Sequence, residues 1–228
     1  KSFWLLDLAW RGIEQRRKVA YFVLGDMSEG QVLLRVGTRA AQIPADIRHD
    51  VKWPTSIKGS KTGKDGMARV THDLRHFKKA LSWQRAWKAC QNTLHMKVRS
   101  KESYLRLVVH PAGGISVDGI NEQIKLWAQD GWVPDVCIID YADNLDMPKG
   151  GDDIRAQINA AWKDMRGLSQ TWHMLVATAT QANAASYGDE VKVITRKNFS
   201  EDKRKLAHVT GMIGLNQTSE EKQKGIYR

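Results

Sequence analysis

Asp140 and the pair Lys1-Ser2 have residue types and positions that fit phosphate and metal chemistry. Asp140 follows an apolar run at residues 136–139, and a carboxylate at the tip of a buried strand can assist Mg²⁺ bound to a triphosphate. Lys1-Ser2 precedes an apolar helical pattern and matches the last two positions of G-x-x-x-x-G-K-[ST]. There the ammonium would contact the β and γ phosphates, and the hydroxyl would bind Mg²⁺. The alternative for Asp140 is a strand-end acid that caps the following turn.

Asp26 and Gln181 also follow predicted strands. The Asp26 carboxylate is placed to polarise a water molecule that attacks the γ phosphate, and the Gln181 amide is placed to sense that phosphate by hydrogen bonding. Each has a purely structural alternative. Asp26 can act as a helix N-terminal acid beside Ser28, and Gln181 can be a buried amide satisfied by the backbone.

Helical and strand patterns alternate along the chain. Periodic apolar residues predict helices, and short continuous apolar runs predict buried strands. The predicted helices cover residues 3–13, 32–42, 73–100, 117–129 and 153–171, and the predicted strands cover 18–24, 104–109, 136–140, 173–178 and 209–215. This alternation indicates a doubly wound α/β fold with a mostly parallel sheet and helices on both faces. Ligands of such sheets bind at the carboxyl edge, where Asp26, Asp140 and Gln181 all fall.

Composition fits one soluble domain over residues 1–228. Hydrophobic residues make up 42% of the chain, and no apolar run approaches the roughly 20 residues that cross a bilayer. We therefore expect a cytoplasmic protein without membrane contact. Cys90 and Cys137 lie far apart in the sequence and are expected to be buried, unbonded thiols.

The net charge of +11 is concentrated in one segment. Residues 46–106 contain fifteen Lys and Arg against five Asp and Glu. Residues 46–100 are therefore predicted to be a basic, helical insertion, in which Trp53, Trp83 and Trp87 alternate with the basic residues. This mixture suits phosphate contacts with base stacking. The same spacing also suits a solvated helix whose tryptophans pack inward, because Trp83 and Trp87 are four residues apart.

Three segments together carry a family resemblance. DMSEGQVLLR at residues 26–35, PDVCIIDYAD at 134–143 and TQAN at 180–183 resemble successive motifs of the DnaB-type replicative helicase ATPase domain, in its bacteriophage-like variant. The resemblance covers almost the whole chain outside the basic insertion. It implies a RecA-like P-loop fold with ATP and Mg²⁺ as cofactors, and a homo-hexameric ring that hydrolyses ATP between subunits and moves single-stranded DNA. A primase or helicase loader is the implied partner, in the cytoplasm of a bacterium or phage-infected host.

The resemblance also implies residue roles by position. Lys1 and Ser2 match the nucleotide-binding loop, Asp26 the catalytic carboxylate, Asp140 the Mg²⁺-associated acid, and Gln181 the residue that couples the γ phosphate to DNA. The family usually has Glu in place of Asp26, and the shorter side chain is expected to slow hydrolysis. The phosphate-loop glycines before Lys1 and the arginine finger expected after the last residue lie outside this sequence. The chain as given is therefore expected to be inactive.

The segment 184–205 resembles the DNA-contacting pore loop of such motors. Its candidate nucleic-acid contacts are Lys192, Arg196, Lys197, Lys203, Arg204 and Lys205. A solvated loop is the structural alternative. Two functional alternatives also remain: a RecA-like recombinase or regulatory ATPase that forms filaments, and a degenerate, non-hydrolysing module that binds nucleic acid through the basic insertion.

Overall fold

The computed structural model describes residues 2–46, 51–58, 69–97, 103–147, 154–182 and 203–216. The chain divides into two compact units. We call the first, Lys1–Glu29 with Ser100–Arg228, the sheet unit, and the second, Gly30–Arg99, the basic unit.

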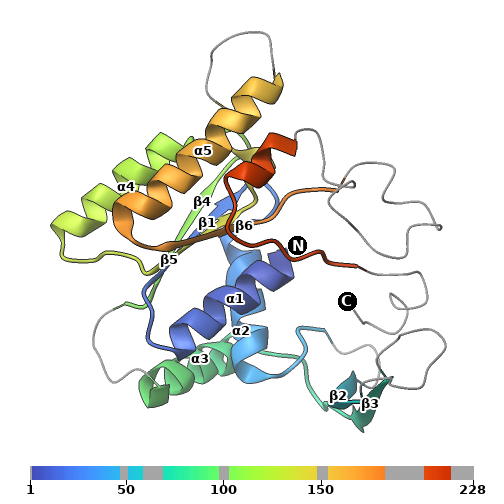
Figure 1. Ribbon diagram of the computed structural model, residues 1–228. Coiled ribbons are helices and arrows are strands. Elements are labelled where there is room, and N and C mark those ends of the chain that lie inside the picture. Colours follow the sequence, from blue (N-terminus) through green and yellow to red (C-terminus); the bar gives the residue numbers. More distant parts are fainter. Residues whose placement is uncertain are drawn as a thin grey trace. The chain divides into compact units, whose positions relative to one another are not determined.

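The sheet unit contains a four-stranded parallel sheet in the order β4-β1-β5-β6 (Figure 1). Its elements are α1 (Ser2–Glu14), β1 (Val19–Leu24), β4 (Leu105–His110), α4 (Val117–Gln129), β5 (Val136–Asp140), η1 (Ala142–Asn144), α5 (Ile154–Trp172), β6 (Leu175–Thr178) and η4 (Lys203–Ala207). Strands β1 and β5 are buried along their whole length, as their continuous apolar sequences predict. The predicted α/β architecture with a parallel sheet is therefore confirmed.

Side-chain alternation separates the two faces of this sheet. In Figure 1, α1 lies on one face and α4 and α5 lie on the other. Phe22 and Ile139 join the main hydrophobic cluster with residues of α4 and α5. Their neighbours one position away point to the opposite face, because successive side chains in a strand alternate. Tyr21 and Asp140 therefore share the face covered by α1, which contacts both β1 and β5.

Local signals fix the ends of α4 where the sequence predicts them. Ser116 caps its start, with Oγ accepting a hydrogen bond from the Gly119 backbone N–H at 3.1 Å. At its end, Gly131 has φ +75° and its N–H donates to the Ala128 carbonyl, while the Trp132 N–H donates to the Trp127 carbonyl. This pair of bonds is a Schellman motif, and the Trp127 and Trp132 rings pack edge to face at 5.2 Å.

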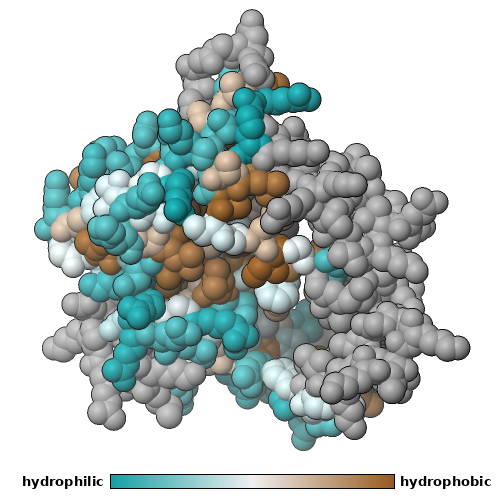
Figure 2. All heavy atoms as spheres, viewed as in Figure 1, coloured by the Kyte–Doolittle hydropathy of each residue, from teal (hydrophilic) through white to brown (hydrophobic). Residues whose placement is uncertain are grey.

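Helix α4 has a mainly hydrophilic outer side and a buried apolar side. Figure 2 shows that hydrophilic residues dominate the outward side of α4, with apolar residues toward the middle of the view. Ile120 and Ile124 of α4 are fully buried, which stabilises the fold by about 1.5–3 kcal/mol for each side chain. No helix in the described ranges is long and apolar enough to cross a membrane.

The basic unit contains α2 (Glu29–Ala41), apart from its first residue, together with β2 (Val51–Lys58), β3 (Arg69–Arg75) and α3 (Trp83–Lys97). Strands β2 and β3 form an antiparallel hairpin. Hydroxyl groups link the two strands, with Thr71 Oγ1 lying 3.1 Å from Thr55 Oγ1 and 2.6 Å from Ser56 Oγ. Helices α2 and α3 approach closely where a Cβ on Gly37 would lie 2.7 Å from the Cβ of Ala86.

Two element predictions are corrected. The helix predicted over 73–100 begins only at Trp83, and residues 69–75 form β3, because cross-strand pairing with β2 overrides the weak helical pattern. The predicted strand 209–215 is not formed. Within residues 203–216, this segment has no regular secondary structure, and Ile213 is 84% exposed.

The cysteines are free thiols in the structure. Cys137 is buried in β5, and Cys90 is half-buried in α3. Burial raises the pKa of Cys137 to about 12, so this thiol stays protonated near neutral pH. The predicted unbonded state is confirmed for both, and the expected full burial is confirmed for Cys137.

We predict that Gly25→Ala lowers the free energy of unfolding by about 1–3 kcal/mol. Gly25 has φ +81°, and a Cβ there would lie 2.8 Å from the Cβ of Ala112. Chemical denaturation measures the effect. Gly167→Ala is the matched control, because Gly167 lies inside α5 with open space around its missing Cβ. That control should gain about 0.5–1 kcal/mol through helix propensity. Equal stability of both variants would contradict the role of Gly25.

Candidate functional site

Asp140 ends β5 as a fully buried carboxylate. Its exposed fraction is 0%, and each of its oxygens accepts one hydroxyl. Ser2 Oγ donates to Oδ1 at 3.0 Å, and Tyr21 Oη donates to Oδ2 at 2.8 Å. The Asp140-Tyr141 peptide bond that follows is cis. The carboxylate is therefore oriented from two other elements, α1 and β1.

Burial raises the pKa of Asp140 above its ordinary value. The hydroxyls of Tyr21 and Ser2 oppose this shift because they stabilise the charged form, whereas the like charge of Asp26 adds to it. The pKa stays raised in spite of the two hydrogen bonds. A cation at this position would offset the burial, so the site favours binding of positive charge.

The N-terminus of α1 provides a complementary preference for an anion. The first backbone N–H groups of a helix have no intrahelical partner and carry partial positive charge. The first turn of α1 contains no acidic side chain, so no carboxylate of its own occupies this position. Ser2, which bonds to Asp140, starts this same helix. A site for positive charge and a site for an anion therefore adjoin, as a metal–phosphate complex requires.

Asp26 lies in the loop after β1, near Asp140. The two carboxylates are close enough for their charges to interact. Asp26 is exposed, and its Oδ1 accepts a hydrogen bond from Asn144 Nδ2 at 3.4 Å. The same amide donates to the Leu24 carbonyl at 2.6 Å. Asn144 thus hydrogen-bonds to the end of β1 and orients the solvent-exposed carboxylate of Asp26.

Gln181 lies just beyond β6 and is held by Asp143. The Gln181 backbone N–H donates to Asp143 Oδ2 at 3.1 Å, and Thr180 Oγ1 donates to Asp143 Oδ1 at 2.9 Å. Thr178 joins the same two strand ends, because its Oγ1 donates to the Ile139 carbonyl and accepts from the Ala142 N–H. The side chain of Gln181 is exposed while its backbone is anchored. This arrangement leaves the amide available to a ligand at the sheet edge.

Lys205 occupies an unexpected position. Its side chain is 1% exposed, with Nζ 3.7 Å from Asp143 Oδ1, 3.5 Å from Thr180 Oγ1 and 5.5 Å from the centre of the Trp162 ring. The prediction of Lys205 as a nucleic-acid contact is corrected, because its ammonium group is buried in an ion pair. Removing one partner of such a buried pair typically costs about 3–5 kcal/mol.

The structure brings Ser2, Asp26, Asp140 and Gln181 to one edge of the sheet. The other predicted contacts are distributed differently. Arg204 is exposed on η4, and the backbone of Lys203 begins that helix. Lys1, Lys192, Arg196 and Lys197 lie outside the described residues.

Sequence reasoning missed four residues of this edge: Tyr21, Asp143, Asn144 and Thr180. Tyr21 carried a usable signal, since a hydroxyl inside an apolar strand needs a hydrogen-bond partner when it is buried. The other three carried none, because the hydrogen bonds that join Asp143 to Thr180 and Asn144 to the end of β1 link segments 37 or more residues apart.

The residues present fit a metal that is shared with phosphates. No group of three or more His, Cys, Asp or Glu side chains that could bind a metal occurs in the described ranges. Mg²⁺ in nucleotide sites is typically bound through one or two carboxylates and substrate phosphates, and it keeps several waters. The Ser2 hydroxyl and the Asp140 carboxylate supply donors of the appropriate kind.

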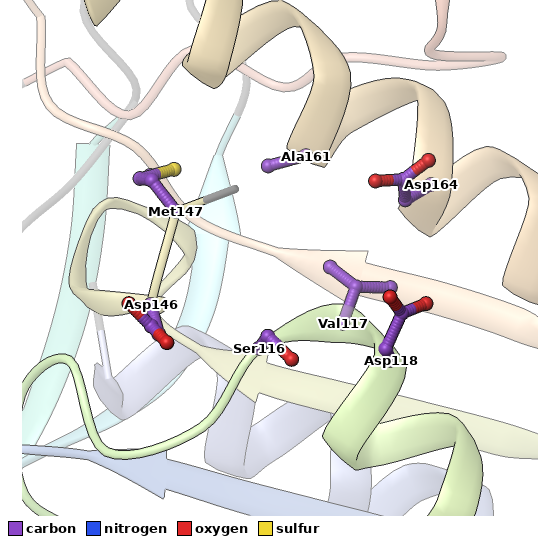
Figure 3. Close-up of a pocket in the computed structure, with 7 residues that line it drawn as sticks. All are labelled: Ser116, Val117, Asp118, Asp146, Met147, Ala161 and Asp164. Carbon is purple, nitrogen blue, oxygen red and sulfur yellow. The ribbon is translucent and has the colours of Figure 1, made fainter. Parts of the chain in front are cut away.

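A cavity of about 350 Å³ lies elsewhere in the sheet unit. Figure 3 shows Asp118 at the start of α4 and Asp164 on α5 directed toward the same space, with Asp146 and Met147 on a further side. Burial, and the like charge of Asp118, raise the pKa of Asp164. None of the predicted site residues that the structure describes lines this cavity, so it is separate from the edge that carries Asp140.

Comparisons with known proteins find similarity in structure only. No protein-family model matches the chain, and no curated protein matches it in sequence. The solved ATPase domain of a phage helicase superposes with a TM-score of 0.65 at 15% identity, over 92% of this chain and 62% of that one. A DnaB-like replicative helicase, solved in a study of its interactions with primase, superposes with a TM-score of 0.50 at 15% identity, over 78% of this chain and 35% of that one. The chain thus spans less than two thirds of both. The chain therefore has an α/β fold similar to that of these two helicase structures.

Proposed function

We propose that this protein is an ATP-driven motor of the replicative helicase type that moves along single-stranded DNA. The observation that carries the proposal is the Ser2–Asp140 hydrogen bond, which joins the N-terminus of α1 to the carboxyl end of β5. Asp26 and Gln181 lie on the same sheet edge. The likeness in fold to the phage helicase ATPase domain supports the same conclusion.

ATP would bind with its phosphates at the start of α1. The backbone N–H groups of the first turn and the ammonium of Lys1 would hold the β and γ phosphates. Ser2 and Asp140 would hold Mg²⁺, which neutralises phosphate charge when bound. The burial that raises the pKa of Asp140 also keeps water away from this position.

Asp26 and Gln181 would act at the γ phosphate. Asp26 would orient the attacking water and accept its proton, with Asn144 holding the carboxylate in place. Gln181 would donate a hydrogen bond to the γ phosphate, and its anchored backbone would transmit the loss of that phosphate to the following loop. Asp26 has the shorter acidic side chain, so turnover should be slow.

The working assembly would be a homo-hexamer that encloses single-stranded DNA. Lys192, Arg196, Lys197, Lys203 and Arg204 would contact the DNA backbone from the segment after Gln181. The compared DnaB-like helicase interacts with primase, and a primase or a helicase loader is the partner we propose here. Such a motor would act in the cytoplasm of a bacterium or a phage-infected cell.

Asp140→Asn tests the proposal in the protein with its native flanking sequence. We expect Mg²⁺-dependent ATP hydrolysis to fall at least about a hundredfold, because the carboxylate beside the metal is lost. Binding of single-stranded DNA at low salt should persist. Phosphate release and DNA binding are the measurements, with Asp130→Asn at an exposed aspartate as the control. Retained hydrolysis in Asp140→Asn would refute the metal role, and ATP binding without hydrolysis in the unaltered protein would favour the non-hydrolysing module.

The pH dependence of stability tests the environment of Asp140 separately. Its folded-state pKa is raised, so the folded protein holds a proton that the unfolded chain releases above about pH 4. Stability is therefore lost as pH rises through the folded-state pKa. Without nucleotide or divalent cation, Asp140→Asn should gain stability relative to the unaltered protein as pH rises above about 4, until the pH passes the folded-state pKa of Asp140. Tyr21→Phe should extend the loss to higher pH, since Tyr21 stabilises the charged form and its removal raises the folded-state pKa further. Parallel stability curves for all three proteins would contradict this account.

Replacing both Arg196 and Lys197 with Ala tests the DNA-contacting segment. DNA-stimulated ATP turnover should fall about tenfold, while basal turnover should change little, because backbone contacts matter only when DNA is bound. Steady-state hydrolysis with and without single-stranded DNA measures both. Equal loss of basal and stimulated turnover would reject the pore-loop assignment.

A further inference from the structure

Helix α3 of the basic unit exposes two tryptophans that the fold does not use for packing. Ser82 caps the helix, its Oγ accepting from the Arg85 N–H at 3.3 Å. Ala86 is 3% exposed and packs against Gly37, which fixes the inward side of α3. Trp83 and Trp87 are 58% and 57% exposed. The inward-packing alternative for this pair is therefore wrong.

The exposed pair forms a continuous aromatic surface with polar neighbours. Residues four apart lie on the same side of a helix, about 6 Å apart along its axis, so the two indoles adjoin. Gln84, Lys88 and Gln91 are exposed beside them at neighbouring helical positions. Single exposed apolar residues are common on proteins, but two adjoining tryptophans are a large unpartnered surface.

Trp53 in the same unit has a different environment. The Arg75 guanidinium lies 4.1 Å from the centre of its ring, so a cation from the chain itself already covers this indole. Within the described parts of the chain, no cation lies in this way over the ring of Trp83 or Trp87. The faces of the α3 pair are therefore open to a ligand, whereas the face of Trp53 is occupied.

The charge of the basic unit identifies the kind of partner. Residues 30–99 contain fifteen Lys and Arg against four Asp and Glu, a net charge of +11. The chain as a whole also has a net charge of +11, so the sheet unit is neutral overall. An anionic polymer is therefore attracted to the unit that carries the tryptophans. Proteins and membranes can also be anionic, but neither offers planar rings for stacking at regular intervals.

We propose that α3 is a platform for single-stranded nucleic acid, separate from the sheet edge. Bases would stack on Trp83 and Trp87, while Lys88, the residue after Trp87, would contact phosphates. Duplexes are disfavoured because their base faces are already stacked. Recognition would be tolerant of sequence and sensitive to salt. The platform needs no nucleotide, so it does not rest on the proposed motor function.

Binding of labelled oligonucleotides to the full chain, without nucleotide, tests the platform. Fluorescence anisotropy would compare oligo-dT, oligo-U and a blunt DNA duplex over a range of salt concentrations. Replacing both Trp83 and Trp87 with Ala should weaken single-strand binding by roughly tenfold or more, whereas replacing both with Phe should retain most of the affinity. If the double Ala variant loses affinity only for oligo-dT, the platform is assigned to DNA. If it loses affinity only for oligo-U, the platform is assigned to RNA. Either result supports the proposal.

Two further variants complete the design. Leu126→Ala removes a 56% exposed apolar side chain from α4 of the neutral sheet unit and should leave binding unchanged. Lys88→Ala should weaken binding and reduce the salt slope by about 0.7. Unchanged binding in the double Ala variant, equal weakening by Ala and Phe, or binding of the duplex as tight as that of the single strand would each overturn the proposal. Circular dichroism confirms that each variant is folded.

Discussion

Burial of one carboxylate is the constraint on which the candidate site depends. Asp140 is fully enclosed, and the Ser2 and Tyr21 hydroxyls replace only part of the hydration that an ionised carboxylate has in water. The folded state includes this unfavourable desolvation of Asp140 because the strand that carries it is central and buried along its length. A cation would offset the remaining cost of burying this charge, and the start of α1 beside it would favour an anion. In the proposed function, a metal–triphosphate complex would supply both together.

A second feature links this edge to the C-terminal part of the sheet unit. Asp143 accepts hydrogen bonds from Thr180 and the Gln181 backbone, and it also pairs with Lys205 of η4. One carboxylate therefore joins the ends of two strands to η4, the helix at the end of the segment proposed to contact DNA. A movement of Gln181 on loss of the γ phosphate would strain these contacts directly. The motor proposal thus has a physical connection between its two sites, made of hydrogen bonds and one ion pair centred on Asp143.

Charge is divided between the two units in a way that fits two kinds of binding. The sheet unit is neutral overall and contains specific ion pairs, such as Asp143 with Lys205. The basic unit carries the whole net charge and exposes aromatic rings on α3. Binding of a nucleotide would depend on specifically placed groups like those of the sheet unit, because each donor must meet one acceptor. Sequence-tolerant contact with a polyanion would need only the net positive charge and exposed rings of the basic unit.

The sequence by itself determined most elements of the sheet unit and its main carboxylate, because these depend on short-range patterns. The bounds of α4 follow from a serine cap and a glycine end, and the buried strands β1 and β5 follow from apolar runs. Only the tertiary structure decided the β2–β3 hairpin, the burial of Lys205 and the hydroxyls that hold Asp140. Ser2 and Asp140 are 138 positions apart, and such contacts form only when packing of the whole sheet brings the segments together. No local propensity encodes that choice.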